Sequence, residues 1–145
     1  MSNKDALFEA FRDFPPRFAE AAMAAEGRTV PTGEWGPREV ARHLIAVERE
    51  VWWVRFASIA EEHEPQWAWT EPGLEPGLDG VPLGEILERF TAVRARSVAI
   101  LDGFDEAAWV RTGVHATYGR LDVTGLLGIV TNHDAEHLVS LTASD

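Results

Sequence analysis

Residues 123–138 read VTGLLGIVTNHDAEHL, and they carry the pattern on which both the fold and the chemistry of this chain are predicted. His133 and His137 are four residues apart, so on an α-helix they lie on one face, one turn above the other. Two neutral imidazoles held in this way form half of a transition-metal site. The helix itself would be held against a core by apolar side chains at helical spacing, namely Leu126, Leu127, Val130, Leu138 and Leu141.

A third ligand is predicted from the second helical stretch. His43 lies there within an apolar pattern that includes Val40 and Leu44, and a polar ring at such a position needs a partner. His43, His133 and His137 are therefore predicted to hold a metal ion, with at least one coordination position left open. The competing interpretation is that all three are surface histidines or hydrogen-bonded core histidines.

Other polar residues are candidates for supporting roles. Glu136 is predicted to act as a catalytic base, a fourth ligand or a hydrogen-bond acceptor for a ligand. Asp134 also flanks the pair, but a solvated position on the helix is at least as good an interpretation for it as a role in the site. His115 falls in a turn-rich segment that could overhang the site, and it is a second candidate for catalysis.

A long irregular connection is predicted over residues 64–81, which are rich in proline and glycine. Loops of this length are often functional. Trp67 and Trp69 lie within it and are predicted to line a substrate pocket, together with Glu50 from the preceding helix. His63, at the start of the connection, is expected to be exposed.

The remaining pattern predicts an all-α fold. Helices are expected over residues 5–26, 37–62, 83–101 and 123–141, with a helical turn at 105–109 and a hairpin or extended loop at 111–122. Pro15 and Pro16 are expected to break the first stretch so that a helix restarts at Pro16; one kinked helix is the alternative. Four amphipathic helices with a long crossover between the second and third predict a four-helix bundle.

The composition of the chain limits the classes of protein to which it can belong. The 145 residues, 46% of them hydrophobic, predict a single domain over 1–145. Cysteine is absent, so a thiol in the chemistry must come from a substrate. A net charge of −11 disfavours nucleic-acid binding. The sequence has neither a signal-peptide pattern nor a membrane-spanning stretch, so a cytoplasmic protein is expected.

Three motifs resemble the DinB-like (YfiT-type) superfamily of metal-binding four-helix bundles. They are WGPREVARHL at residues 35–44, GRLDVT at 119–124 and NHDAEHL at 132–138. The resemblance spans nearly the whole chain, and the three metal-binding histidines of that family fall on His43, His133 and His137. It implies a bundle with a long crossover, a divalent ion such as zinc or nickel, and a homodimer.

The resemblance also implies a range of functions. Members include transferases that activate low-molecular-weight thiols such as bacillithiol or mycothiol, and a mycothiol-dependent isomerase. The leading hypothesis is thus a metal-dependent thiol transferase acting on a small molecule. The alternatives are a metal-binding stress-response bundle without turnover, and a metal-free bundle that serves for dimerisation.

Overall fold

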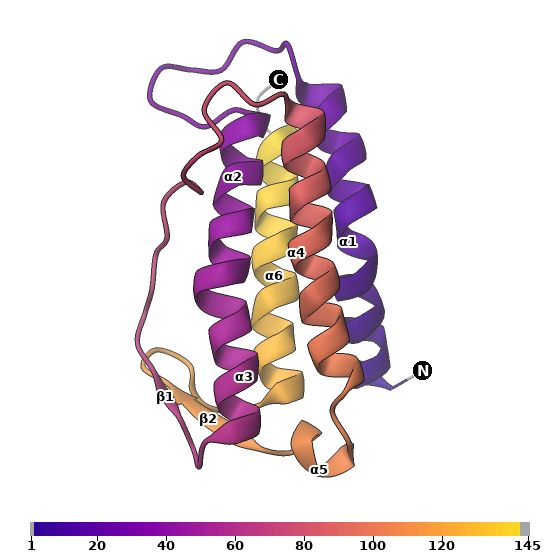
Figure 1. Cartoon of the computed structure of the whole chain (residues 1–145), viewed down its shortest axis with the longest axis vertical. Helices are drawn as coiled ribbons and strands as arrows, with labels where there is room; N and C mark the ends of the chain where they lie inside the picture. Colours follow the sequence, from indigo (N-terminus) through magenta and orange to yellow (C-terminus); the bar gives the residue numbers. More distant parts are fainter. Residues whose placement is uncertain (1, 143–145) are drawn as a thin grey trace.

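The computed structural model describes residues 2–142 and contains four long helical segments packed side by side (Figure 1). These are α1 (Asn3–Ala25), a continuous second segment, α4 (Leu83–Asp102) and α6 (Val123–Thr142). The second segment consists of α2 (Pro37–Val47), the π-helical turn η1 (Glu48–Trp52) and α3 (Trp53–Glu61). The predicted four-helix bundle with a long crossover is confirmed. None of the described helices combines the length and apolar character needed to cross a bilayer.

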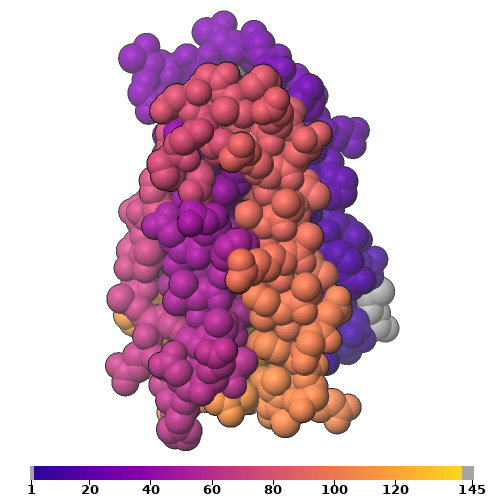
Figure 2. Space-filling view, viewed as in Figure 1, coloured from indigo at the N-terminus to yellow at the C-terminus, as the bar shows by residue number. Residues whose placement is uncertain are grey.

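The order of the helices explains the crossover. α2–α3 and α4 run in the same direction, so residues 62–82 must travel back along the whole bundle before α4 can begin (Figure 1). In the space-filling view, α2–α3 and α4 cover this face, and α6 behind them is almost hidden (Figure 2). The inner face of α6 carries Leu126, Leu127 and Val130, which are fully buried.

A small sheet closes one end of the bundle beside the short helix α5 (Glu106–Trp109) (Figure 1). The segment at 111–122 forms a hairpin of β2 (Thr112–His115) and β3 (Gly119–Asp122). The crossover contributes β1 (Gln66–Trp67), which pairs in parallel with β2 so that Trp67 lies opposite His115. The crossover is thus not entirely irregular, because this strand fixes its first part to the hairpin.

The first helix does not break at its prolines. α1 runs continuously through Pro15 and Pro16, so the predicted restart at Pro16 is wrong. Proline lacks an N–H, which leaves the Phe11 carbonyl without its usual donor four residues on. Arg94 supplies one instead, because its Nη1 donates to the Phe11 oxygen at 2.9 Å. A contact from another helix therefore replaces the missing backbone bond.

The π-helical turn changes which residues of the second segment face the core. A π turn inserts one residue into the helical repeat, so the apolar face predicted from 3.6-residue spacing shifts after it. Val51 is buried as expected, but Val54 is exposed, whereas Arg55 and Phe56 are buried. The face predicted to continue through Val54 is therefore wrong, and Arg55 turns inward.

The core consists of two apolar clusters with a charged group between them. Arg94 of α4 is 1% exposed and lies 4.2 Å from the Phe11 ring of one cluster and 5.6 Å from the Phe14 ring of the other. Its guanidinium donates to both oxygens of Glu48 and both oxygens of Asp134. Arg94 therefore connects α4 to α1, η1 and α6 in the middle of the bundle.

Candidate metal centre

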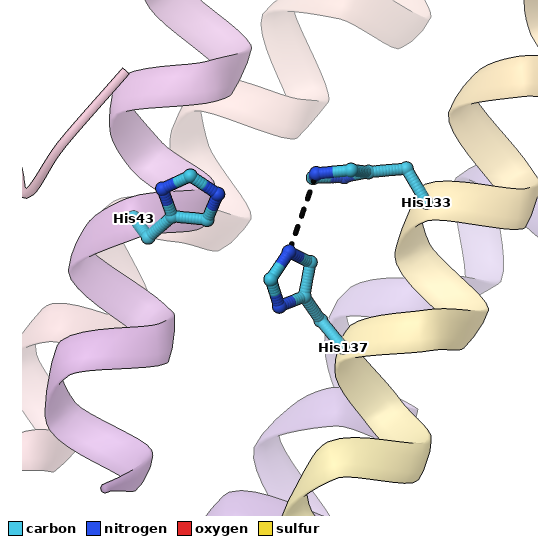
Figure 3. A group of neighbouring side chains, drawn as sticks. All are labelled: His43, His133 and His137. Atoms are coloured by element: carbon cyan, nitrogen blue, oxygen red, sulfur yellow. Dashed lines mark hydrogen bonds between the residues drawn. The ribbon is translucent and has the colours of Figure 1, made fainter. Parts of the chain in front are cut away.

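Three imidazoles from two helices converge in the bundle (Figure 3). His43 comes from α2, and His133 and His137 come from successive turns of α6. One nitrogen from each ring can be chosen such that all three lie within 4.8 Å of one another. The structure thus brings together the three histidines predicted from the sequence, in a geometry that can hold a metal ion.

The nitrogen separations suit a shared ion. The Nε2 atoms of His133 and His137 are 3.2 Å apart. Two imidazole nitrogens each about 2.0–2.1 Å from one zinc ion are separated by roughly 3.3 Å in tetrahedral geometry. The Nδ1 of His43 lies 3.1 Å from the Gly73 carbonyl, an acceptor, so Nδ1 carries the hydrogen and Nε2 keeps its lone pair. The donor set therefore fits a divalent transition metal.

Burial keeps the two α6 histidines uncharged. It lowers the pKa of His133 to about 3, with added effects from the neighbouring His137, His43 and Arg94. Burial and the neighbouring His43 lower the pKa of His137 to about 4. Both rings are thus neutral at pH 7, which is the form that binds metals.

A cavity of about 600 Å³ opens from the three histidines. Its walls include three tryptophans, Trp35, Trp52 and Trp69, and two valines, Val47 and Val51. Of the residues predicted to support the site, Trp69, His115 and Glu136 line this cavity. An ion held by the histidines would face a space large enough for a small organic molecule.

Two predicted pocket residues lie elsewhere. Trp67 is buried in the core, where its Nε1 donates to Ser58 Oγ at 2.9 Å, because β1 pairing turns it inward. Glu50 is exposed, since the π turn places Glu48 rather than Glu50 toward the core. Neither is among the residues that line the cavity, so both predictions are wrong.

Asp134 also differs from expectation, because it is not solvated. It is buried, and its carboxylate is held by Arg94 at 2.8 and 2.9 Å. Burial raises its pKa to about 6 despite the opposing charge of Arg94, and the nearby Glu48 carboxylate adds to the increase. The residue next to His133 therefore anchors α6 and does not face the cavity. His63 is exposed, as predicted.

His115 is held in a defined protonation state. Its Nδ1 accepts hydrogen bonds from the backbone N–H groups of Thr117 and Tyr118, at 2.9 and 3.3 Å. An accepting Nδ1 carries no proton, so the hydrogen of the neutral ring is on Nε2. Burial, and then the charge of Arg55, lower the pKa of His115. This residue is therefore set up to donate a hydrogen bond from Nε2.

The sequence interpretation missed Arg55 as a cavity residue. Arg55 lines the same cavity and is only 5% exposed. The available signal was its place in the otherwise apolar run WWVRFASIA, residues 52–60. A lone arginine there is either exposed or serves a specific purpose, and the π turn decides in favour of burial.

Comparison with known families shows to which family this chain belongs. The sequence profile of the DinB superfamily matches residues 5–140, nearly all of the chain. The chain belongs to the DinB superfamily. Among curated protein sequences, none gives a significant match.

Solved structures include a relative with the same fold. YfiT from Bacillus subtilis is described as a probable metal-dependent hydrolase with an unusual four-helix bundle topology. It is 18% identical to this DinB-superfamily chain, with a TM-score of 0.73 over 97% of this chain and 84% of YfiT. At this identity the match establishes the shared fold.

Proposed function

We propose that this DinB-superfamily protein is a divalent-metal-dependent enzyme that transfers a low-molecular-weight thiol to a small electrophile. His43, His133 and His137 hold the ion, with zinc or nickel as the metal. The observation that carries the proposal is the convergence of three imidazoles beside a cavity of about 600 Å³. An ion with three protein ligands keeps a position open for substrate, as catalytic sites do.

The ligand set favours activation of a nucleophile. A divalent ion would lower the pKa of a thiol or water molecule beside it and so supply a nucleophile at neutral pH. Imidazole ligands bring no negative charge, so they would leave the double positive charge of the ion uncompensated. The chain has no cysteine, so the thiol is a substrate and not a protein group.

Glu136 is the proton acceptor in this proposal. It lines the cavity one residue before His137, and its Oε1 accepts from Asn132 Nδ2 at 3.2 Å. In the proposed reaction the thiol proton passes to the Glu136 carboxylate. The sulfur electron pair forms a bond to the electrophilic carbon, and the leaving group departs with the electron pair of the bond that breaks. His115 donates a hydrogen bond to substrate and is not a base.

Metal content tests the foundation of the proposal. We expect about one zinc or nickel ion per chain in protein purified without a metal-affinity tag. His137→Ala removes one of the three ligands and should lose the ion. His63→Ala, which alters an exposed histidine outside the cluster, is the matched control and should retain it. A metal-free wild-type protein that takes up neither zinc nor nickel would refute the metal site.

Turnover is tested separately with the metal-loaded protein. Glutathione or 2-mercaptoethanol is offered with 1-chloro-2,4-dinitrobenzene, and chloride release is followed with formation of the thioether. We expect a rate above background that is lost in His137→Ala and reduced about 100-fold or more in Glu136→Gln. A bound ion without turnover across a panel of thiols and electrophiles supports the non-catalytic, stress-response alternative instead.

Hydrolysis is a second candidate, favoured by the shared fold with YfiT, which is described as a probable metal-dependent hydrolase. In that case water takes the place of the thiol in the same site. Consumption of an activated ester or amide without added thiol, lost in His137→Ala, would support it. A homodimer and a cytoplasmic location stay predictions from the sequence, to be tested by sedimentation and by cell fractionation.

A further inference from the structure

We propose that Arg55 and His115 form a carboxylate-binding pair in the cavity, so that the substrate is a small molecule carrying a carboxylate. This inference rests on the proposal that the cavity receives substrate, but it does not require the metal. It concerns specificity, since neither residue belongs to the three-histidine cluster.

Arg55 is a buried cation that has no carboxylate counter-charge among residues 2–142. Its only hydrogen bond among the described residues runs from Nη2 to the Ala68 carbonyl at 3.1 Å, and no carboxylate in that part of the chain lies within 4.0 Å of it. Burial lowers its pKa, which is the sign of an unfavourable position for a charge. Buried charges are normally paired. The buried Arg94, with two carboxylates, shows how this chain pairs a structural arginine.

The surroundings of Arg55 leave part of its guanidinium available to a ligand. Arg55 Cζ lies 5.6 Å from the Trp52 ring and 5.9 Å from the Trp67 ring, so aromatic faces partly replace the missing anion. Glu71 and Glu136 also line the cavity, but both are exposed and neither forms an ion pair with Arg55. In a chain of net charge −11, this unpaired cation is a local attraction for an anion.

His115 supplies a second donor of the right kind. Its Nδ1 is taken by two backbone N–H groups, so the donor left for a ligand is Nε2–H. Both residues line the same cavity and lie beside the same strand, because Arg55 donates to the Ala68 carbonyl just after β1 and His115 lies opposite Trp67 in the parallel pairing. A guanidinium and an imidazole N–H together can satisfy the oxygens of a carboxylate.

The single positive charge indicates a carboxylate and not a phosphate. A carboxylate carries one negative charge, which Arg55 neutralises, whereas a phosphate monoester carries nearly two near pH 7. The tryptophan-lined walls of the cavity disfavour the second negative charge of a phosphate, which Arg55 would leave unneutralised.

Trp52 lies between the Arg55–His115 pair and the three-histidine cluster. Its ring lies 5.7 Å from that of His133 and 5.6 Å from Arg55 Cζ, so one indole separates the two sites. The carboxylate would therefore be a few bonds from the reacting atom.

The test uses benzoate and benzamide, which have the same shape and differ in charge. Each is titrated calorimetrically into the full chain, both metal-free and zinc-loaded. We expect the metal-free wild type to bind benzoate at least about tenfold more tightly than benzamide. Arg55→Met should abolish this preference, and His115→Asn, which keeps an acceptor near Nδ1 but loses the Nε2 donor, should reduce it several-fold. Arg55→Lys, which keeps the charge, should retain part of it.

Arg96→Met is the matched control, because Arg96 also stacks on a tryptophan but is exposed on α4 and does not line the cavity. It should bind benzoate as the wild type does. Equal binding of benzoate and benzamide by the wild type, or an unchanged preference in Arg55→Met, would overturn the inference. A preference that needs zinc and survives Arg55→Met would place the carboxylate at the metal, which refutes the role of Arg55 and leaves the metal proposal standing. A preference lost in Arg55→Met in a protein that binds no zinc supports the pair while the metal proposal fails.

Discussion

Replacing Arg94 with methionine should cost this bundle a large part of its stability. The substitution keeps much of the side-chain volume but removes the partner of two buried carboxylates, Glu48 and Asp134. Breaking a buried ion pair by removing one partner costs about 3–5 kcal/mol. The Phe11 carbonyl also loses its donor, which adds about 1–3 kcal/mol, because Pro15 cannot provide one. We expect a loss of about 4 kcal/mol or more in the free energy of unfolding.

Urea unfolding followed by circular dichroism at pH 7 measures this loss. Arg96→Met, an exposed arginine on the same helix, should change the unfolding free energy by no more than about 0.5 kcal/mol. The gap between Arg94→Met and wild type should narrow toward pH 5, because unpaired buried carboxylates have raised pKa values and are neutralised by protons. A loss below about 1 kcal/mol at pH 7 would refute the reasoning that this network is a net support of the fold.

A double-mutant cycle separates the carbonyl from the charges. Pro15→Ala restores an N–H that can reach the Phe11 oxygen along the helix. It should therefore recover about 1 kcal/mol more in the Arg94→Met background than in the wild type. Additive effects would show that Arg94 does not compensate for the proline.

Three further predictions follow from the site and the hairpin. Below pH 6.5 the unfolded His133 binds a proton, whereas the folded His133, with its pKa near 3, does not, so the unfolding free energy of the metal-free protein falls as the pH falls. His133→Gln should reduce this slope, measured by urea unfolding, by up to about 1.4 kcal/mol per pH unit. Equal slopes in the wild type and the variant would contradict that pKa. Gly113→Ala should cost about 1–3 kcal/mol by the same measurement, since its Cβ would lie 2.3 Å from the buried Trp67 ring, and Gly84→Ala, which meets nothing, is the control. Zinc at 100 times its Kd should stabilise the wild type by about 2.7 kcal/mol in thermal unfolding and should not stabilise His137→Ala.

The sequence was sufficient for the regular parts of the fold. The spacing of apolar residues predicted α4 and α6 closely, and the i, i+4 spacing of His133 and His137 predicted that their rings lie on one face of α6. The third histidine followed because a polar ring in an apolar pattern is unusual. These features are local, and helical geometry alone connects them.

The errors came from interactions between distant parts of the chain. The continuity of α1 through Pro15 depends on Arg94, which lies 79 positions later and gives no local signal. The burial of Arg55 depends on a π turn that 3.6-residue periodicity does not contain. Trp67 is turned into the core by strand pairing with a hairpin nearly 50 residues away. Each case needs a tertiary contact to decide between two locally acceptable conformations.

The Arg94 network also fixes the alignment of the helices along their axes. Apolar stripes on neighbouring helices tolerate sliding, because one leucine replaces another when a helix moves by a turn of about 5.4 Å. Arg94 forms hydrogen bonds with one residue in each of α1, η1 and α6. If any of these elements slid along its axis, a buried charge or carbonyl would lose its partner inside the core. Asp134 directly follows His133, and Glu48 lies five residues after His43. The Arg94 ion pairs that keep the helices from sliding therefore also fix the height along the bundle at which His43 faces His133 and His137.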